Sequence, residues 1–172
     1  MPRSRTTQPE IVDLPDQLMA VIYSRGDPNE QSDPLAALYG AVYTLKFVRK
    51  RTGGDFKVGP LRARWPDAHL LPKEEWLGVW ALPIPDDVTS LPQKTPGFDV
   101  RIERWSYGAV AQILHTGSYL DEGNDVQRLH EFIDASGYDI TGVHEEEYLT
   151  SPKAKTQKTI IRYPVTPKSG RV

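Results

Sequence analysis

One short segment gathers residue types that could do chemistry. Residues 143–149 read VHEEEYL, so an imidazole, three carboxylates and a phenol stand close together. In a β-strand, the period of two puts His144, Glu146 and Tyr148 on one face. A carboxylate between an imidazole and a phenol can attract a cation or act as a general base. The spacing alone leaves an alternative open, an exposed edge strand with three solvated glutamates.

Aromatic residues form a second group of candidates, because the chain has four tryptophans. Trp76 and Trp80 are predicted to share one face of a strand, and Trp65 ends the strand before it. Tyr39 and Tyr43 are spaced to stack along a predicted helix. Rings beside a carboxylate suit flat, hydrophobic and often cationic ligands, and the alternative is a plain aromatic core.

Several kinds of chemistry are missing from the sequence. With no cysteine, disulfides, thiolate catalysis and cysteine-ligated metals are excluded. The sequence has no glycine-rich phosphate loop, no G-x-S-x-G and no H-E-x-x-H motif. We therefore expect no metal and no cofactor. The acidic turn of Asp121, Glu122 and Asp125 is predicted to be a solvated loop and helix start, since it lacks calcium-loop spacing.

Composition limits the class of protein and its partners. The 172 residues are 38% hydrophobic and 26% charged, which suits one globular domain or two small fused halves. The formal charge of −2 argues against direct nucleic-acid binding, which needs clustered basic residues. No apolar run reaches the roughly 18–20 residues of a membrane span. We expect a cytoplasmic protein without a membrane partner, and the sequence leaves its oligomeric state open.

Hydrophobic periodicity and turn signals predict the same element order in both halves. In the first half, we expect a strand, a helix and two strands, at 17–23, about 33–52, 56–65 and 75–84. In the second half, we expect the same order, at 101–116, about 125–136, 140–149 and 157–165. The helix of the second half should carry Val126, Leu129, His130 and Ile133 on one stripe.

This order predicts an α+β fold. Two duplicated strand-helix-strand-strand units would form one antiparallel curved sheet, with both helices on one face and a cleft between the halves. The predicted boundaries are an N-terminal tail 1–16, a single domain 17–166 and a C-terminal tail 167–172. Within the domain we expect repeat one at 17–85, a linker at 86–98 and repeat two at 99–166.

Several ordered segments carry a family resemblance. In the second half these are VAQILHTGSY, LHEFIDASGY, VHEEEYLTSP and KTIIRYPV, which begin at 110, 129, 143 and 158. In the first half they are ALYGAVYTLKF, PLRARW and IPDDVT, which begin at 37, 60 and 84. Together they resemble the GyrI-like small-molecule-binding family, in its stand-alone, multidrug-binding branch. The resemblance implies the duplicated fold and a cleft for hydrophobic, frequently cationic molecules.

The resemblance also assigns residues. Glu146 matches the pocket glutamate of the family and Tyr148 the tyrosine beside it, while His115 and Tyr119 match the strand-turn motif. With the residues already singled out, the candidate ligand-binding set is Tyr39, Tyr43, Trp65, Trp76, Trp80, Tyr107, His115, Tyr119, His144, Glu146 and Tyr148.

Three functions follow as hypotheses. The first is binding of hydrophobic or cationic aromatic small molecules. The second is hydrolysis, because certain relatives open cyclopropane-bearing, DNA-alkylating natural products; Glu146 and Tyr148 would then be catalytic. The sequence has Arg62 where the family has a glutamate, and Glu74 or Glu75 could supply a second acid. The third is an interaction module that binds no small molecule.

Overall fold

The computed structural model describes residues 8–151 and 153–169, without the side chain of Leu120. The chain divides into two compact units, which are described separately. The α1 unit is Asp16–Ser106, and the α2 unit combines Met1–Pro15 with Tyr107–Val172. Parts of the predicted tails, 1–7 and 170–172, lie outside the described residues.

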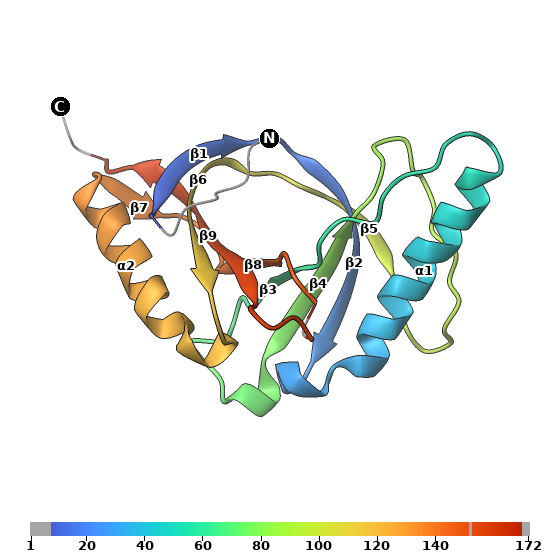
Figure 1. Cartoon of the computed structure of the whole chain (residues 1–172), viewed down its shortest axis with the longest axis horizontal. Coiled ribbons are helices and arrows are strands. Elements are labelled where there is room, and N and C mark those ends of the chain that lie inside the picture. Colours follow the sequence, from blue (N-terminus) through green and yellow to red (C-terminus); the bar gives the residue numbers. More distant parts are fainter. Residues whose placement is uncertain (1–7, 152, 170–172) are drawn as a thin grey trace. The chain divides into compact units, whose positions relative to one another are not determined.

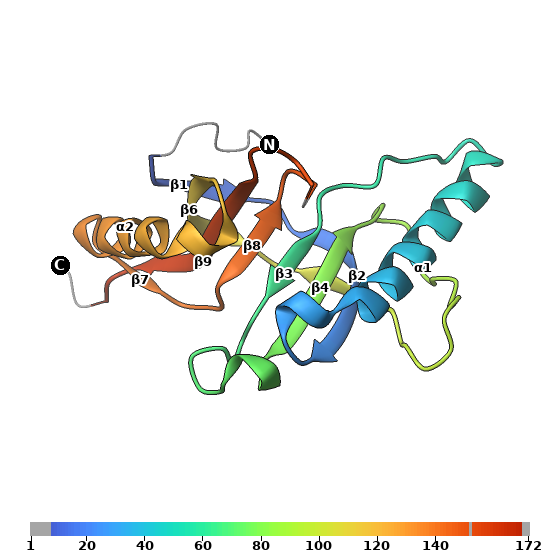
Figure 2. The ribbon, with the colours of Figure 1, turned by 60° about the horizontal axis from the view of Figure 1, so that its bottom comes forward.

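The α1 unit is an antiparallel sheet with one long helix. Its elements are β2 (Gln17–Arg25), η1 (Pro28–Glu30), α1 (Ser32–Lys50), β3 (Arg62–Arg64), η2 (Lys73–Glu75), β4 (Leu77–Pro83) and β5 (Arg101–Trp105). The strands lie in the order β3-β4-β2-β5, and every pair is antiparallel. Helix α1 packs against β2 and β4 (Figure 2).

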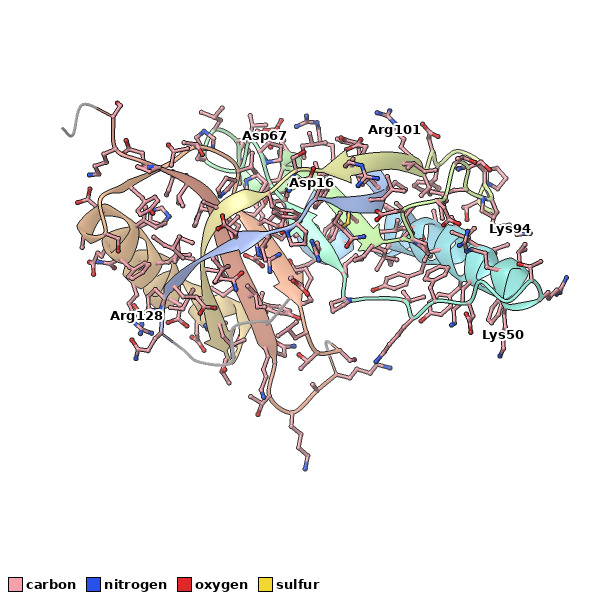
Figure 3. All side chains as sticks on the ribbon, turned by 90° about the horizontal axis from the view of Figure 1, so that it is seen from above. Asp16, Lys50, Asp67, Lys94, Arg101 and Arg128 are labelled. Atoms are coloured by element: carbon pink, nitrogen blue, oxygen red, sulfur yellow. The ribbon has the colours of Figure 1, made fainter. Side chains whose placement is uncertain are left out.

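The buried residues explain these elements. Strand β2 is a β-branched apolar run whose residues from Leu18 to Ile22 are all buried, as expected for a strand with both faces covered. Helix α1 buries Leu38, Val42 and Leu45, which lie on one stripe of the helix. Its last turn ends at Lys50, on the outside of the helix (Figure 3), where a cation complements the helix dipole.

The α2 unit has the second helix and an antiparallel sheet (Figure 1). Its elements are β1 (Glu10–Leu14), β6 (Gly108–Thr116), η3 (Tyr119–Asp121), α2 (Glu122–Ala135), β7 (Tyr138–Ile140), β8 (Glu145–Tyr148) and β9 (Lys158–Pro167). The order is β1-β6-β9-β8, with β7 paired to another part of β9. Leu129 and Ile133 of α2 pack on Ile113 and Ile161 of the sheet.

The α+β class and the antiparallel pairing are confirmed within each unit. The strand-helix-strand-strand order is met only in part, because β5 follows it in the α1 unit and the α2 unit has β1 before it and three strands after its helix. The strand bounds differ from the prediction. The strand predicted at 56–65 is limited to β3, because Gly59 and Pro60 interrupt the pattern. The strand predicted at 101–116 is two strands, β5 and β6, with a break at Ser106 and Tyr107.

Two strands lie outside the predicted repeat boundaries. Strand β1 falls inside the predicted tail 1–16 and pairs with β6. Strand β5 was expected in repeat two, and it pairs with β2 of the α1 unit instead. The strand predicted at 140–149 is also two strands, because a turn at Thr141 and Gly142 separates β7 from β8. No helix in the described part of the chain combines the length and apolarity that crossing a bilayer requires.

Strand β8 buries three glutamates in a row. Glu145, Glu146 and Glu147 are only 2%, 7% and 2% exposed, so the alternative of solvated glutamates on an exposed edge is wrong. The outer two face Arg162 of β9, which is itself buried. Its Nη1 donates to Glu145 Oε2 at 2.7 Å, and its Nη2 donates to Glu147 Oε1 at 2.8 Å.

Arg162 is therefore the shared cation of these two carboxylates. Burial lowers the pKa of Arg162, but the charges of Glu145 and Glu147 outweigh burial and raise it overall. Its Nε also donates to Gln112 at 3.3 Å, and the Tyr107 hydroxyl donates to Glu145 at 3.0 Å. These contacts join β8, β9 and β6 through side chains as well as through the backbone.

We predict that Arg162→Met lowers the free energy of unfolding by about 3–5 kcal/mol, because it removes the guanidinium that pairs with two buried carboxylates. Urea denaturation at pH 7 measures the change. The control is Arg101→Met, which removes an exposed pair with Asp99 and should cost less than about 1 kcal/mol. Equal losses for the two variants would contradict the structural role given to Arg162.

Candidate functional site

Glu146 is the centre of a hydrogen-bonded cluster in the α2 unit. His144 Nε2 lies 2.6 Å from Glu146 Oε2, and the Tyr148 hydroxyl donates to Glu146 Oε1 at 3.1 Å. These contacts confirm that the three side chains share one face, as the period of two predicted. A further side-chain hydrogen bond joins Glu146 to Glu122, the first residue of α2.

The orientation of His144 is set by Tyr163 of β9. The Tyr163 hydroxyl lies 2.6 Å from His144 Nδ1, and burial with the charges of Glu146 and Glu122 raises the pKa of Tyr163 to about 12. A protonated phenol can donate to Nδ1, which leaves Nε2–H to donate to Glu146. The Tyr163 ring also packs edge-on against His130 and His144, with centroids 4.9 and 5.2 Å away.

Glu122 and Glu146 hold different protonation states. Burial raises the pKa of Glu122 to about 9, with help from the charge and hydrogen bond of Glu146 and the charge of Asp125. Burial also raises the pKa of Glu146, but the hydrogen bonds from His144, Glu122 and Tyr148 outweigh it and lower the value overall. At neutral pH the pair therefore shares one proton, held mainly by Glu122.

Two tyrosine rings border this carboxyl pair. Tyr119 and Tyr148 are edge to face, with centroids 5.6 Å apart. Burial and the charge of Glu146 raise the pKa of Tyr148 well above its ordinary value, so its hydroxyl stays a donor. Tyr119 is 39% exposed, whereas Glu146 is 7% exposed. The cluster thus combines an ionised carboxylate, a carboxylic acid and aromatic surface that solvent reaches at Tyr119.

His115 has a supporting position beside this cluster. It is buried, with Nδ1 2.7 Å from Asp125 Oδ2 and Nε2 2.7 Å from the Ser118 carbonyl oxygen. It therefore ties the end of β6 to the turn that carries Tyr119 and to the first turn of α2. The predicted Tyr107 is likewise engaged, by its hydrogen bonds to Glu145.

The α1 unit holds the remaining predicted aromatic residues. Tyr39 and Tyr43 stack on α1 with centroids 6.3 Å apart, and Tyr43 continues to Phe47 at 6.3 Å. Tyr43 is 41% exposed and Phe47 56% exposed. The predicted stacking is confirmed, and it leaves an aromatic stripe partly open to solvent.

The tryptophans of the α1 unit are arranged differently from the prediction. Trp65 and Trp80 pack edge to face at 5.7 Å, and Trp80 is buried. Trp76 precedes β4, which begins at Leu77, so the expectation that Trp76 and Trp80 share one strand is wrong. The Trp76 indole instead donates to the Leu71 carbonyl at 2.9 Å, after the η2 turn. The pair of Trp65 and Trp80 is typical of aromatic core packing.

Two residues of the cluster escaped the sequence analysis. Glu122 was expected in a solvated loop and helix start; it does begin α2, but its partly buried contact with Glu146 shows that it is not solvated as expected. Its sequence signal was ambiguous, since acids are common at helix starts for electrostatic reasons alone. Tyr163 lies two residues after Ile161 in a predicted strand, and nothing else in the sequence marks it as a functional residue. Within 8–151 and 153–169, no three histidine or acidic side chains are grouped to hold a metal ion.

We predict that the free energy of unfolding of Glu122→Gln increases relative to that of the wild type as the pH rises from 6 to 9. Folded wild type keeps a proton on Glu122 up to about pH 9, whereas the unfolded chain loses it near 4.5. The wild-type contribution of Glu122 is therefore lost as pH rises through this window. Glutamine stays neutral and can still donate to Glu146. Urea denaturation at each pH measures the difference between variant and wild type.

One proton changes the free energy of unfolding by at most about 1.4 kcal/mol per pH unit, and partial exposure of Glu122 reduces this. Glu131→Gln is the matched control, an exposed position on the same helix. Its difference from wild type should stay flat with pH. A flat difference for Glu122→Gln as well would mean that Glu122 is ionised in the folded protein.

Comparisons with known proteins identify the family. The model of the GyrI-like small molecule binding domain matches residues 7–165. An uncharacterized conserved protein from Listeria innocua is similar in structure, with a TM-score of 0.83 and 29% identity over 94% of this chain and 93% of that one. A structure described as a hydrolase from Listeria innocua has a TM-score of 0.81 and 28% identity over 95% and 94%.

The C-terminal domain of EcmrR shares the fold, with a TM-score of 0.63 and 12% identity over 94% of this chain and 98% of that one. No curated protein is significantly similar to the chain in sequence. Because the family model spans nearly the whole sequence, the chain belongs to the GyrI-like small-molecule-binding domain family.

Proposed function

We propose that the protein binds hydrophobic, often cationic, aromatic small molecules at the cluster around Glu146. The observation that carries the proposal is a buried, ionised carboxylate bordered by the rings of Tyr119 and Tyr148. A carboxylate away from bulk water attracts a cation more strongly than an exposed one. Tyrosine rings add cation-π attraction and flat apolar contact.

The cluster has the features of a prepared site. Glu146 accepts from His144 and Tyr148, and His144 is fixed in turn by Tyr163. Such a chain holds the carboxylate in one orientation before any ligand arrives, which lowers the entropic cost of binding. Tyr119, the exposed member, is the side chain that a ligand would meet first.

We predict that Glu146→Gln weakens binding of a permanent flat cation such as ethidium at least tenfold, while a neutral analogue such as phenanthridine changes less than threefold. Glutamine keeps the size of the side chain and removes its charge. Calorimetric titration gives both affinities, and tenfold corresponds to about 1.4 kcal/mol. The control is the exposed Glu131→Gln, with the same change in net charge. Equal losses for cation and neutral compound would contradict the charge role of Glu146.

A second candidate is hydrolysis of an electrophilic, cyclopropane-bearing compound. Glu122 and Glu146 in opposite protonation states favour it, since one is a proton acceptor and the other a donor. The similar Listeria innocua structure described as a hydrolase also favours it. In this reaction, Glu146 would take a proton from water while the water oxygen bonds to a ring carbon. The ring C–C bond would break, its electrons would pass to a conjugated carbonyl of the substrate, and the resulting enolate would take the proton of Glu122, so that the product gains one water.

This candidate predicts a product heavier than the substrate by one water, detected by mass spectrometry after incubation with the protein. Glu146→Gln should reduce kcat at least a hundredfold, because general-base catalysis contributes about 10²–10⁴. The KM should change little. Unchanged turnover in this variant would remove Glu146 as the base, and an unmodified ligand would leave binding as the function.

Other expectations stay predictions. They are a ligand-binding role for the α1-unit aromatics, a duplicated origin of the two units, a cleft between the repeats and a cytoplasmic location. The α1-unit residues concerned are Tyr39, Tyr43, Trp65, Trp76 and Trp80.

A further inference from the structure

We propose that a cationic ligand at the Glu146 cluster expels the proton that Glu122 shares with Glu146, so that cation uptake releases a proton. This inference rests on the proposed binding function and adds a second, ionisable residue to it. Glu122 becomes the residue that makes affinity for cations depend on pH.

The geometry requires a proton between the two residues. Ionised carboxylates only accept hydrogen bonds, so Glu122 and Glu146 can bond only if one of them carries a proton. Glu146 already has donors on both oxygens, His144 Nε2 at 2.6 Å and the Tyr148 hydroxyl at 3.1 Å. It therefore keeps its hydrogen bonds when the shared proton leaves.

Glu122 is the residue of the pair whose negative charge would lack compensation. Its Oε1 is buried and has no hydrogen-bond partner within the described part of the chain. The ionisable groups that interact with Glu122 are Tyr119 of η3, Asp125 of α2, Glu146 and Tyr148 of β8, and Tyr163 of β9. The basic side chains next to these groups are already engaged: His144 bonds to Glu146 at 2.6 Å, and Arg128 and His115 bond to Asp125 at 2.9 and 2.7 Å.

A bound cation would supply what is lacking. The pKa of Glu122 lies near 9 because burial and the charge of Glu146 oppose a second negative charge. A ligand cation beside the pair stabilises that second charge and lowers the pKa toward neutral. By linkage, proton release on binding means that affinity for the cation rises with pH, by at most tenfold per pH unit.

The experiment is calorimetric titration of the full chain with ethidium, whose charge does not change with pH. Titrations at pH 8 in Tris and in phosphate separate the heat of binding from the heat of buffer protonation. We expect about half to one proton released per ethidium bound, and an affinity that rises roughly three- to tenfold between pH 7 and pH 8.

Two variants and one ligand serve as controls. Glu122→Gln should bind ethidium with no proton release and no rise in affinity with pH, because glutamine cannot ionise. Glu131→Gln, exposed on the same helix, should behave like wild type. Phenanthridine, neutral at pH 8, should bind without proton release. The pH dependence of the wild type tests the inference even if a variant folds poorly.

The outcomes separate this inference from the proposed function. Ethidium binding without proton release, or release that persists in Glu122→Gln, overturns the inference and leaves the binding function intact. No ethidium binding at any pH overturns both. Proton release that disappears in Glu122→Gln supports both.

Discussion

Strand β8 buries three consecutive carboxylates, and this constraint governs the α2 unit. Burying a charge costs several kcal/mol unless partners compensate it, and neighbouring strand residues face opposite sides, so each side needs its own partners. Arg162 compensates Glu145 and Glu147 on one side. On the other side, Glu146 is held by His144, Tyr148 and the protonated Glu122.

The two sides therefore respond differently to their surroundings. A guanidinium stays charged throughout the physiological range, so the side with Arg162 is fixed in charge and serves the fold. The partners of Glu146 can all donate a hydrogen bond, and in the proposed cation binding one of them, Glu122, also loses its proton. This second side carries the exposed ring of Tyr119. For these reasons the proposals for ligand binding and chemistry are placed on the Glu146 side.

How much of this could be predicted depends on the range of the interactions. Alternation correctly placed His144, Glu146 and Tyr148 on one face, because it is a local regularity. Helical spacing correctly gave Leu129 and Ile133 of the predicted stripe as buried and Val126 as partly buried, whereas His130 of that stripe is exposed. The pairing of β1 with β6 depends on contacts distant in sequence, which local periodicity does not record. Glu122 was misjudged for the same reason, since an acid at a helix start looks the same whether solvent or Glu146 faces it.

The turn before α2 connects the aromatic and acidic parts of the cluster. His115 Nε2 faces the Ser118 carbonyl oxygen, which only accepts, so this nitrogen carries hydrogen. Its other ring nitrogen faces the Asp125 carboxylate at 2.7 Å. Between these two anchors the chain carries Tyr119 and Glu122, and Gly117, with φ of 126°, begins the turn in a backbone conformation that favours glycine. Tyr119, the proposed first contact of a ligand, and Glu122 thus lie in a turn that His115 anchors at Ser118 and Asp125. Any shift of this turn would move both of them relative to Glu146, which is fixed on its strand.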